Sequence, residues 1–134
     1  MTPSWGDLGN DTLIGNGKHD RLRGGEGDDK LKGKTGDDRL NGGDHNDHID
    51  GGKGDDTLVG GSGADLFRLS KGRDTIKDFS IEGGDQMLIS NAIELTIEQV
   101  GSNLLVTDDD KNISTTLKGV ELDDLLAHQP ELFG

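Results

Sequence analysis

Aspartate recurs every nine residues through the first half of the chain, at eight consecutive positions without a miss. The eight residues are Asp11, Asp20, Asp29, Asp38, Asp47, Asp56, Asp65 and Asp74. A glycine stands five residues before each of the first seven, and an apolar residue stands two residues after all eight. Carboxylates and turn carbonyls are hard oxygen donors, the ligands that Ca²⁺ prefers. The spacing therefore predicts a row of calcium-binding turns.

The clearest unit of the repeat is GGEGDDKLK, over residues 24–32. Its glycines permit positive φ, so the first part of the unit can form a tight turn with carbonyls that point inward. The last part forms a short strand, whose apolar middle side chain points away from its polar flanks. One buried residue per strand cannot support a strand by itself, so the units must stack. Two units then make one coil, with a turn at each end.

Stacked coils place equivalent turns side by side, so that each turn neighbours the turn two repeats further on. On one edge the predicted ligand pairs are Asp11/Asp29, Asp29/Asp47 and Asp47/Asp65, and on the other they are Asp20/Asp38, Asp38/Asp56 and Asp56/Asp74. Turn glycines complete the sites: Gly24, Gly25, Gly27, Gly33, Gly36, Gly42, Gly43, Gly51, Gly52, Gly54, Gly60, Gly61 and Gly63. We expect five to six Ca²⁺ ions, because the turn that ends at Asp74 begins with Leu69 and lacks the leading glycines.

A ninth turn over residues 80–85 follows, slipped by two positions, and its Asp85 stands one coil and two further positions after Asp65. Asp85 is therefore a further candidate ligand, with Asp78 as its neighbour. The segment Asp108-x-Asp110-x-Asn112 echoes the start of a calcium loop, but a glycine and a glutamate of that motif are missing. We interpret it as a hairpin turn.

The composition limits what else the protein can be. The 134 residues include no cysteine, which excludes disulfides and thiolate metal sites. There are 27 Asp and Glu against 14 Lys and Arg, and a net charge of −13 argues against nucleic acid as the main partner. The chain has no apolar run long enough to span a membrane and no usual secretory signal peptide.

The two halves of the chain differ in apolar content. Leu, Ile, Val and Phe together are only about half as frequent in residues 6–68 as in residues 69–134. The first half cannot fold on apolar burial alone, so it is either a disordered tether or held by something else. A biased tether would drift out of register, and the unbroken nine-residue spacing therefore favours the ligand-held fold.

The nonapeptide G-G-x-G-x-D-x-U-x is the calcium-binding repeat of RTX (repeats-in-toxin) proteins, and the chain resembles that family over residues 6–77. Residues 72–90 look like the segment that closes such rolls. The tail with Thr116-Leu117-Lys118-Gly119-Val120, and then Leu122, Leu125, Leu126 and Phe133, is similar to the C-terminal ends of RTX proteins exported by type I secretion, serralysin-type proteases among them. The resemblance implies a module that is unfolded in the calcium-poor cytosol and folds outside the cell.

These observations together predict an all-β fold, a right-handed parallel β-roll of eight nonapeptide repeats over residues 6–77. Residues 78–134 form a C-terminal cap, with strands in 86–90 and 93–118, turns at 101–103 and 108–112, and a short helix over 121–128. One sheet of the roll stacks Leu13, Leu31, Ile49 and Phe67, and the other stacks Leu22, Leu40, Leu58 and Ile76. The cap covers the strand edges at the open end of the roll.

No motif for catalysis stands out, so we expect no enzyme activity from this chain. His45-Asn46-Asp47-His48 is not a zinc-protease motif, and we interpret it as a solvated turn. The leading hypothesis is a secreted, extracellular calcium-binding module that supports type I secretion through an exporter and folds outside the cell. Two alternatives remain, namely a recognition module for an acidic polysaccharide and the C-terminal end of a secreted hydrolase. The chain enters the first repeat almost at once, which suits an excised fragment or a very small protein.

Overall fold

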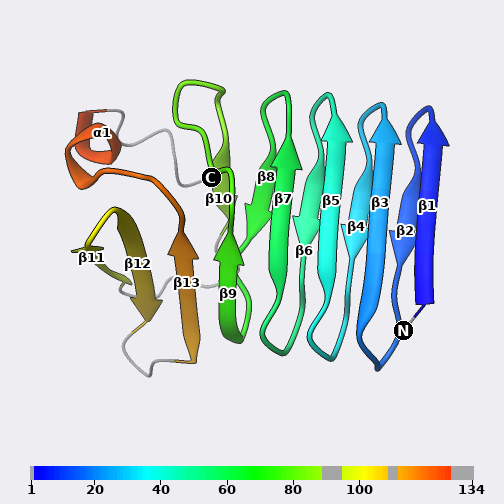
Figure 1. Cartoon of the computed structure of the whole chain (residues 1–134), viewed down its shortest axis with the longest axis horizontal. Coiled ribbons are helices and arrows are strands. Elements are labelled where there is room, and N and C mark those ends of the chain that lie inside the picture. The colour runs from blue at the N-terminus through cyan, green and yellow to red at the C-terminus, as the bar shows by residue number, and fades with distance from the viewer. Residues whose placement is uncertain (1, 89–94, 109–111, 128–134) are drawn as a thin grey trace.

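The computed structural model describes residues 2–88, 95–108 and 112–127, and it shows a chain wound into a parallel β-roll (Figure 1). Short strands alternate between two facing sheets, with a tight turn at each crossing. The first sheet contains β1 (Thr2–Leu8), β3 (Asp20–Glu26), β5 (Arg39–Asp44), β7 (Thr57–Gly61) and β9 (Gly72–Ile76). The second contains β2 (Thr12–Ile14), β4 (Lys30–Lys32), β6 (His48–Asp50), β8 (Leu66–Arg68) and β10 (Gln86–Leu88). This arrangement confirms the predicted all-β parallel roll.

The strand register confirms that one coil consists of two repeats. In the second sheet Leu13 lies opposite Leu31, Leu31 opposite Ile49 and Ile49 opposite Phe67. In the first sheet Leu22, Leu40, Leu58 and Ile76 are paired in the same way. A two-residue slip then brings Met87 of β10 opposite Phe67, so the ninth turn continues the roll.

The strand β1 extends the roll on its N-terminal side beyond the predicted start at residue 6. It pairs in parallel with β3, and its Thr2 and Ser4 lie opposite Asp20 and Leu22. The sequence pattern did not reveal this strand, because Thr2 and Ser4 replace the aspartate and the apolar residue that mark the other repeats. At this end of the roll Trp5 is 72 % exposed.

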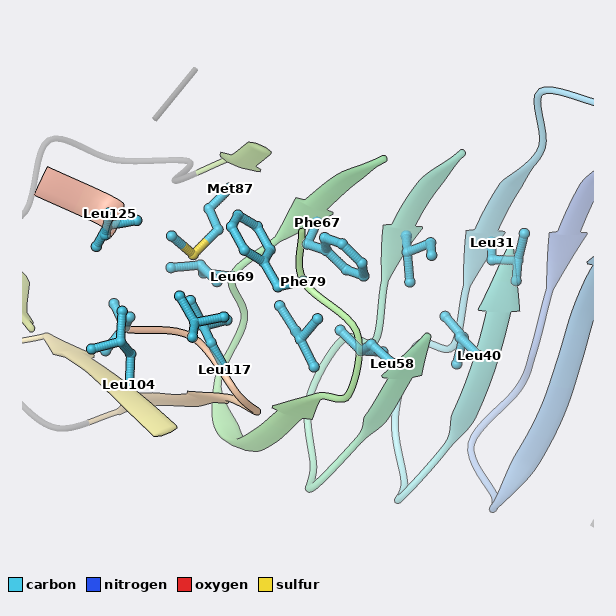
Figure 2. Packing of buried hydrophobic residues seen from close by; sticks show 14 of the residues in the cluster. Leu31, Leu40, Leu58, Phe67, Leu69, Phe79, Met87, Leu104, Leu117 and Leu125 are labelled. Atoms are coloured by element: carbon cyan, nitrogen blue, oxygen red, sulfur yellow. The ribbon is translucent and has the colours of Figure 1, made fainter. Parts of the chain in front are cut away.

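A narrow apolar core fills the space between the two sheets and grows wider toward the C-terminus (Figure 2). In the first coils it consists of one inward residue per strand, such as Leu31 and Leu40, each at most 2 % exposed. At the other end Phe67 packs against Phe79, with ring centroids 6.0 Å apart. Apolar burial is therefore concentrated where the glycine-rich repeats end.

The C-terminal segment continues the first sheet. Strand β13 (Ile113–Leu117) pairs in parallel with β9 and places Leu117 opposite Ile76, and β12 (Asn103–Asp108) and β11 (Leu95–Val100) follow it in antiparallel order. A short helix, α1 (Leu122–Ala127), buries Leu125 completely. Pairing with β13 covers the outer edge of β9. The predicted turn at 101–103 and the helix are found, whereas residues 89–94 and 109–111 lie outside the described residues.

Within the described residues, no helix has the length and apolar character needed to cross a membrane.

Candidate metal centre

The repeating aspartates form a ladder along each edge of the roll. One carboxylate oxygen, Oδ1, accepts a hydrogen bond from the backbone N–H of the repeating aspartate one coil earlier. Seven such bonds, 2.7–3.0 Å long, join Asp11 to Asp29, Asp29 to Asp47, Asp47 to Asp65, Asp65 to Asp85, Asp20 to Asp38, Asp38 to Asp56 and Asp56 to Asp74. The structure therefore brings together the predicted aspartate pairs and extends one row to Asp85.

Seven of these aspartates keep one carboxylate oxygen without a partner. These buried oxygens accept no hydrogen bond: Oδ2 of Asp11, Asp29, Asp38, Asp47, Asp56 and Asp65, and Oδ1 of Asp20. Asp20 differs from the others because its Oδ2 accepts the Asn16 N–H. Buried polar atoms in folded proteins nearly always have a partner, and an orphan costs roughly 1–3 kcal/mol, more when it is charged. These repeated orphaned oxygens could each serve as a ligand of a cation.

The leading glycine of a turn lies against each orphaned Oδ2. A Cβ atom added to Gly33 would lie 2.6 Å from the carbonyl oxygen of Gly51 and closer still to Oδ2 of Asp38. At Gly24 the added Cβ would fall on both Oδ2 of Asp29 and the carbonyl oxygen of Gly42. Glycine thus leaves room where a carboxylate oxygen and a carbonyl from the next coil approach each other.

The second and third glycines of the turn have a different role. Gly25 and Gly27 adopt φ of 95° and 116°, a region that L side chains rarely adopt. A Cβ at either position would collide with a carbonyl of the previous coil, that of Asp7 or of Gly9. His45 replaces the third glycine of its turn and keeps a positive φ of 74°. The three positions together pack the carbonyls of adjacent turns closely.

The donor set fits Ca²⁺. It combines carboxylate and carbonyl oxygens from two adjacent turns, which can supply the six to eight oxygen ligands that this ion takes. Among the described residues no group of three or more His, Cys, Asp or Glu side chains is placed to hold a metal ion. Such a site would consequently depend on backbone carbonyls as much as on side chains.

Burial raises the pKa of the inner aspartates. The pKa of both Asp56 and Asp65 rises to about 8, chiefly through loss of solvent and further through neighbouring carboxylates. The same causes raise the pKa of Asp47 to about 6, and burial also raises the pKa of Asp38. Without a cation, the folded roll therefore holds carboxylates that resist ionisation near neutral pH. A bound cation would reverse this preference.

The last two turns differ from the others in how the second oxygen is used. Oδ2 of Asp74 accepts a hydrogen bond from the Ser70 hydroxyl at 3.1 Å, and Oδ2 of Asp85 accepts one from the Ser80 N–H at 2.8 Å. Both carboxylates are therefore fully paired within the protein. Asp78, the expected neighbour of Asp85, instead accepts hydrogen bonds from the N–H groups of Gly60 and Gly61.

A second ladder, not predicted from the sequence, lies outside the first. The residue before each of the first six repeating aspartates accepts a hydrogen bond from the backbone N–H one coil later. On one edge the acceptors are Asn10, Asp28 and Asn46, and on the other they are His19, Asp37 and Asp55. These side chains are exposed, and the same nine-residue spacing could have revealed them. They bond the turns to one another without using the inner oxygens.

Comparisons with known proteins agree with this geometry. The sequence profile of the RTX calcium-binding nonapeptide repeat (4 copies) matches residues 5–40, 24–58 and 41–76. No curated protein sequence matches the chain.

Several solved structures are similar to the chain. Two are subunits of the mannuronan C5-epimerase of Azotobacter vinelandii. The first is 25 % identical to this chain with a TM-score of 0.43, and the match covers 96 % of this chain and 80 % of the subunit. The second is 24 % identical with a TM-score of 0.48, and the match covers 98 % of this chain and 91 % of the subunit. A third is the extracellular lipase of Serratia marcescens, which is 16 % identical with a TM-score of 0.49. That match covers 98 % of this chain and 39 % of the lipase.

Proposed function

The chain belongs to the family of RTX calcium-binding nonapeptide repeats, and from this membership we propose that it is a module that folds when Ca²⁺ fills the spaces between its turns. The observation that carries the proposal is the set of seven buried carboxylate oxygens without a hydrogen bond, four on one edge of the roll and three on the other. Six of them lie against the leading glycine of a turn. A bound Ca²⁺ ion would supply the positive partner that each of these carboxylate oxygens lacks within the protein.

The proposal assigns five to six ions. Five sites lie between Asp11 and Asp29, Asp29 and Asp47, Asp47 and Asp65, Asp20 and Asp38, and Asp38 and Asp56. The sixth, between Asp56 and Asp74, is the weakest, because the Ser70 hydroxyl already occupies the second oxygen of Asp74. Both carboxylate oxygens of Asp85 accept hydrogen bonds, from the N–H groups of Asp65 and Ser80. The proposal therefore assigns no ion to this turn, which closes the roll.

Binding energy at such sites becomes folding energy, because the sites do not exist in the unfolded chain. In a calcium-poor cytosol the rows of aspartate repel one another, and the apolar core of the first coils is too narrow to compensate. The chain then stays unfolded, which suits passage through a type I exporter. Outside the cell, abundant Ca²⁺ folds it. The module is thus proposed to act extracellularly, in secretion and folding, with no catalytic step assigned to it.

The experiment that tests this function is a calcium titration of the whole chain followed by circular dichroism. We expect little β-structure in chelator, a cooperative gain as Ca²⁺ rises to millimolar levels, and a much weaker response to Mg²⁺, which prefers strict octahedral geometry. Isothermal titration calorimetry gives the number of ions, expected to be five or six. A roll fully folded in chelator would refute the proposal.

A further inference from the structure

The outer face of the first sheet is free of acidic side chains from β3 to β9. The residues on either side of the inward Leu22, Leu40, Leu58 and Ile76 point outward, and none of them is Asp or Glu. This contrasts with 27 acidic residues in the chain as a whole. Four basic residues on this face, together with Trp5 of the neighbouring β1, form a surface that we call the arginine face: Trp5, Arg21, Arg23, Arg39 and Lys77.

The arginines of the arginine face are unpaired. The part of the chain that the structure describes contains no ion pair or side-chain hydrogen bond to Arg21, Arg23 or Arg39. Arg21 and Arg39 are directly opposite each other on β3 and β5, which are about 4.8 Å apart. Like charges in direct cross-strand opposition destabilise a sheet. No described side chain offsets that cost, so an anion from outside the protein would relieve it.

The surface around these residues is shaped to receive a ligand. A shallow groove of about 490 Å³ follows the arginine face, and both Trp5 and Lys77 line it. Trp5 lies opposite Arg23 in the register of β1 and β3 and is 72 % exposed. A guanidinium can pair with a carboxylate through two parallel hydrogen bonds, and an exposed indole offers a flat apolar surface beside it.

The edges of the roll restrict what can lie in the groove. Exposed acidic residues of the turns border the face on both sides, with Glu26 and Asp44 on one edge and Asp37 and Asp55 on the other. A wide polyanion such as duplex DNA would overlap these carboxylates. A single linear chain that runs along the roll axis, across the strands, would meet only the arginine face.

Calcium strengthens this attraction, and this step rests on the proposed function. Residues 6–77 carry 15 Asp and Glu against 12 Lys and Arg, a formal charge of −3. Five Ca²⁺ ions, each with a charge of +2, would bring the roll to +7, with the added charge held inside the edges. The aspartates that repel an anion in the free chain would then be neutralised.

We propose that the arginine face binds a linear carboxylated polysaccharide, whose carboxylates pair with Arg21 and Arg39 along the roll axis and with Arg23 beside Arg21. Single-stranded nucleic acid suits the face less well. Proteins that bind it stack its bases on several aromatic side chains, and Trp5 is the only aromatic member of the arginine face. A polyuronate needs no stacking series, since each of its sugars carries a carboxylate.

Trp5 is the only tryptophan of the chain, so its fluorescence reports on this face alone. The experiment titrates the full, calcium-saturated protein with oligogalacturonates too short to gel with Ca²⁺. The test variant is Arg21→Gln/Arg39→Gln. The matched control is Lys30→Gln/Lys32→Gln, which removes the same charge from β4 on the opposite sheet. We expect the test variant to bind about fivefold more weakly or worse, and the control to bind as the wild type does.

Equal weakening in both variants would overturn the proposal in favour of general charge attraction, and equal affinity for single-stranded DNA of matched charge would overturn it in favour of an unselective anion surface. Absence of binding at low salt, with circular dichroism showing a folded roll, would overturn it while the calcium-folding function stands. Failure of the roll to form in Ca²⁺ at all would refute the calcium function instead.

Discussion

Replacement of Asp38 by asparagine separates the calcium-binding role of the inner row from its structural role. The amide oxygen of asparagine can still accept the 2.7 Å hydrogen bond that the Asp20 N–H donates to Oδ1 of Asp38. What Asp38→Asn removes is the negative charge at Oδ2, the oxygen that has no partner. Since Asp38 borders two proposed sites, both lose a charged ligand.

The magnitude follows from mass action. A site filled at 100 times its dissociation constant contributes about 2.7 kcal/mol of stability. Loss of two such sites removes about 5 kcal/mol, comparable with the whole net stability of many domains. Asp11→Asn affects a single site and should cost about half as much. In chelator we expect no such loss of stability from Asp38→Asn. The substitution removes a buried carboxylate whose pKa burial has already raised, so the metal-free fold should be equally stable or slightly more stable.

The assay is the calcium midpoint of folding, measured by circular dichroism for wild type, Asp38→Asn, Asp11→Asn and a control, Asp37→Asn. Asp37 lies one residue earlier, is exposed, and accepts the Asp55 N–H through Oδ1 at 2.8 Å. Its replacement changes the net charge equally but touches no inner oxygen. We expect the largest rise in midpoint for Asp38→Asn, a smaller one for Asp11→Asn and almost none for Asp37→Asn. An equal shift for Asp37→Asn and Asp38→Asn would refute the assignment of the inner row, and equality of Asp11→Asn and Asp38→Asn would refute the pairing of turns two repeats apart.

Proton binding, glycine size and the cap provide three further tests. The pKa of Asp56 and of Asp65 is about 8 in the folded roll against an ordinary 3.8, so the metal-free fold binds more protons than the unfolded chain. Its stability should fall as pH rises from about 4 to about 8, and acidification in chelator should restore β-structure by circular dichroism; a signal independent of pH would contradict this. Gly24→Ala places a Cβ on the Asp29 and Gly42 oxygens and should raise the calcium midpoint sharply, whereas Gly17→Ala, whose Cβ would have only the Thr35 hydroxyl at 3.3 Å, should have little effect. Deletion of residues 86–134 removes β13 and Met87 from the end of the roll, so size-exclusion chromatography should show aggregation or a weak response to Ca²⁺; a monomer that folds at the wild-type calcium level would argue against the capping role.

The repeat made much of this structure predictable from the sequence. In a roll of identical coils every long-range contact repeats at one fixed separation, so the nine-residue period specifies the turns and also the partners across strands. The register of Leu31 with Ile49 and the bond from the Asp29 N–H to Asp47 both follow from the length of one coil. The glycine pattern likewise predicted where positive φ and close backbone approach occur.

The sequence pattern failed where residues depart from the repeat. Strand β1 carries Ser4 and Thr2 at the marker positions, yet its backbone pairs with β3 all the same, because parallel pairing uses N–H and C=O groups that the backbone carries whatever the side chain. A search for the marker residues alone could not find it. The outer ladder escaped notice for a related reason, since Asn10, His19 and Asp28 are different residue types that all provide an acceptor atom.

Sequence alone determined the coil length, the two stacked apolar rows and the inner aspartate rows, because each depends on local turn chemistry repeated without change. Only the tertiary structure decided which carboxylate oxygens are left without a partner. Asp65 and Asp74 hold the same position of the repeat, but the Ser70 hydroxyl pairs with the second oxygen of Asp74, while that of Asp65 has no donor. Asp78 likewise reaches back across the coil to the N–H groups of Gly60 and Gly61. Whether a buried carboxylate needs a cation depends on every donor within hydrogen-bond distance, and the fold brings those donors from elsewhere in the chain.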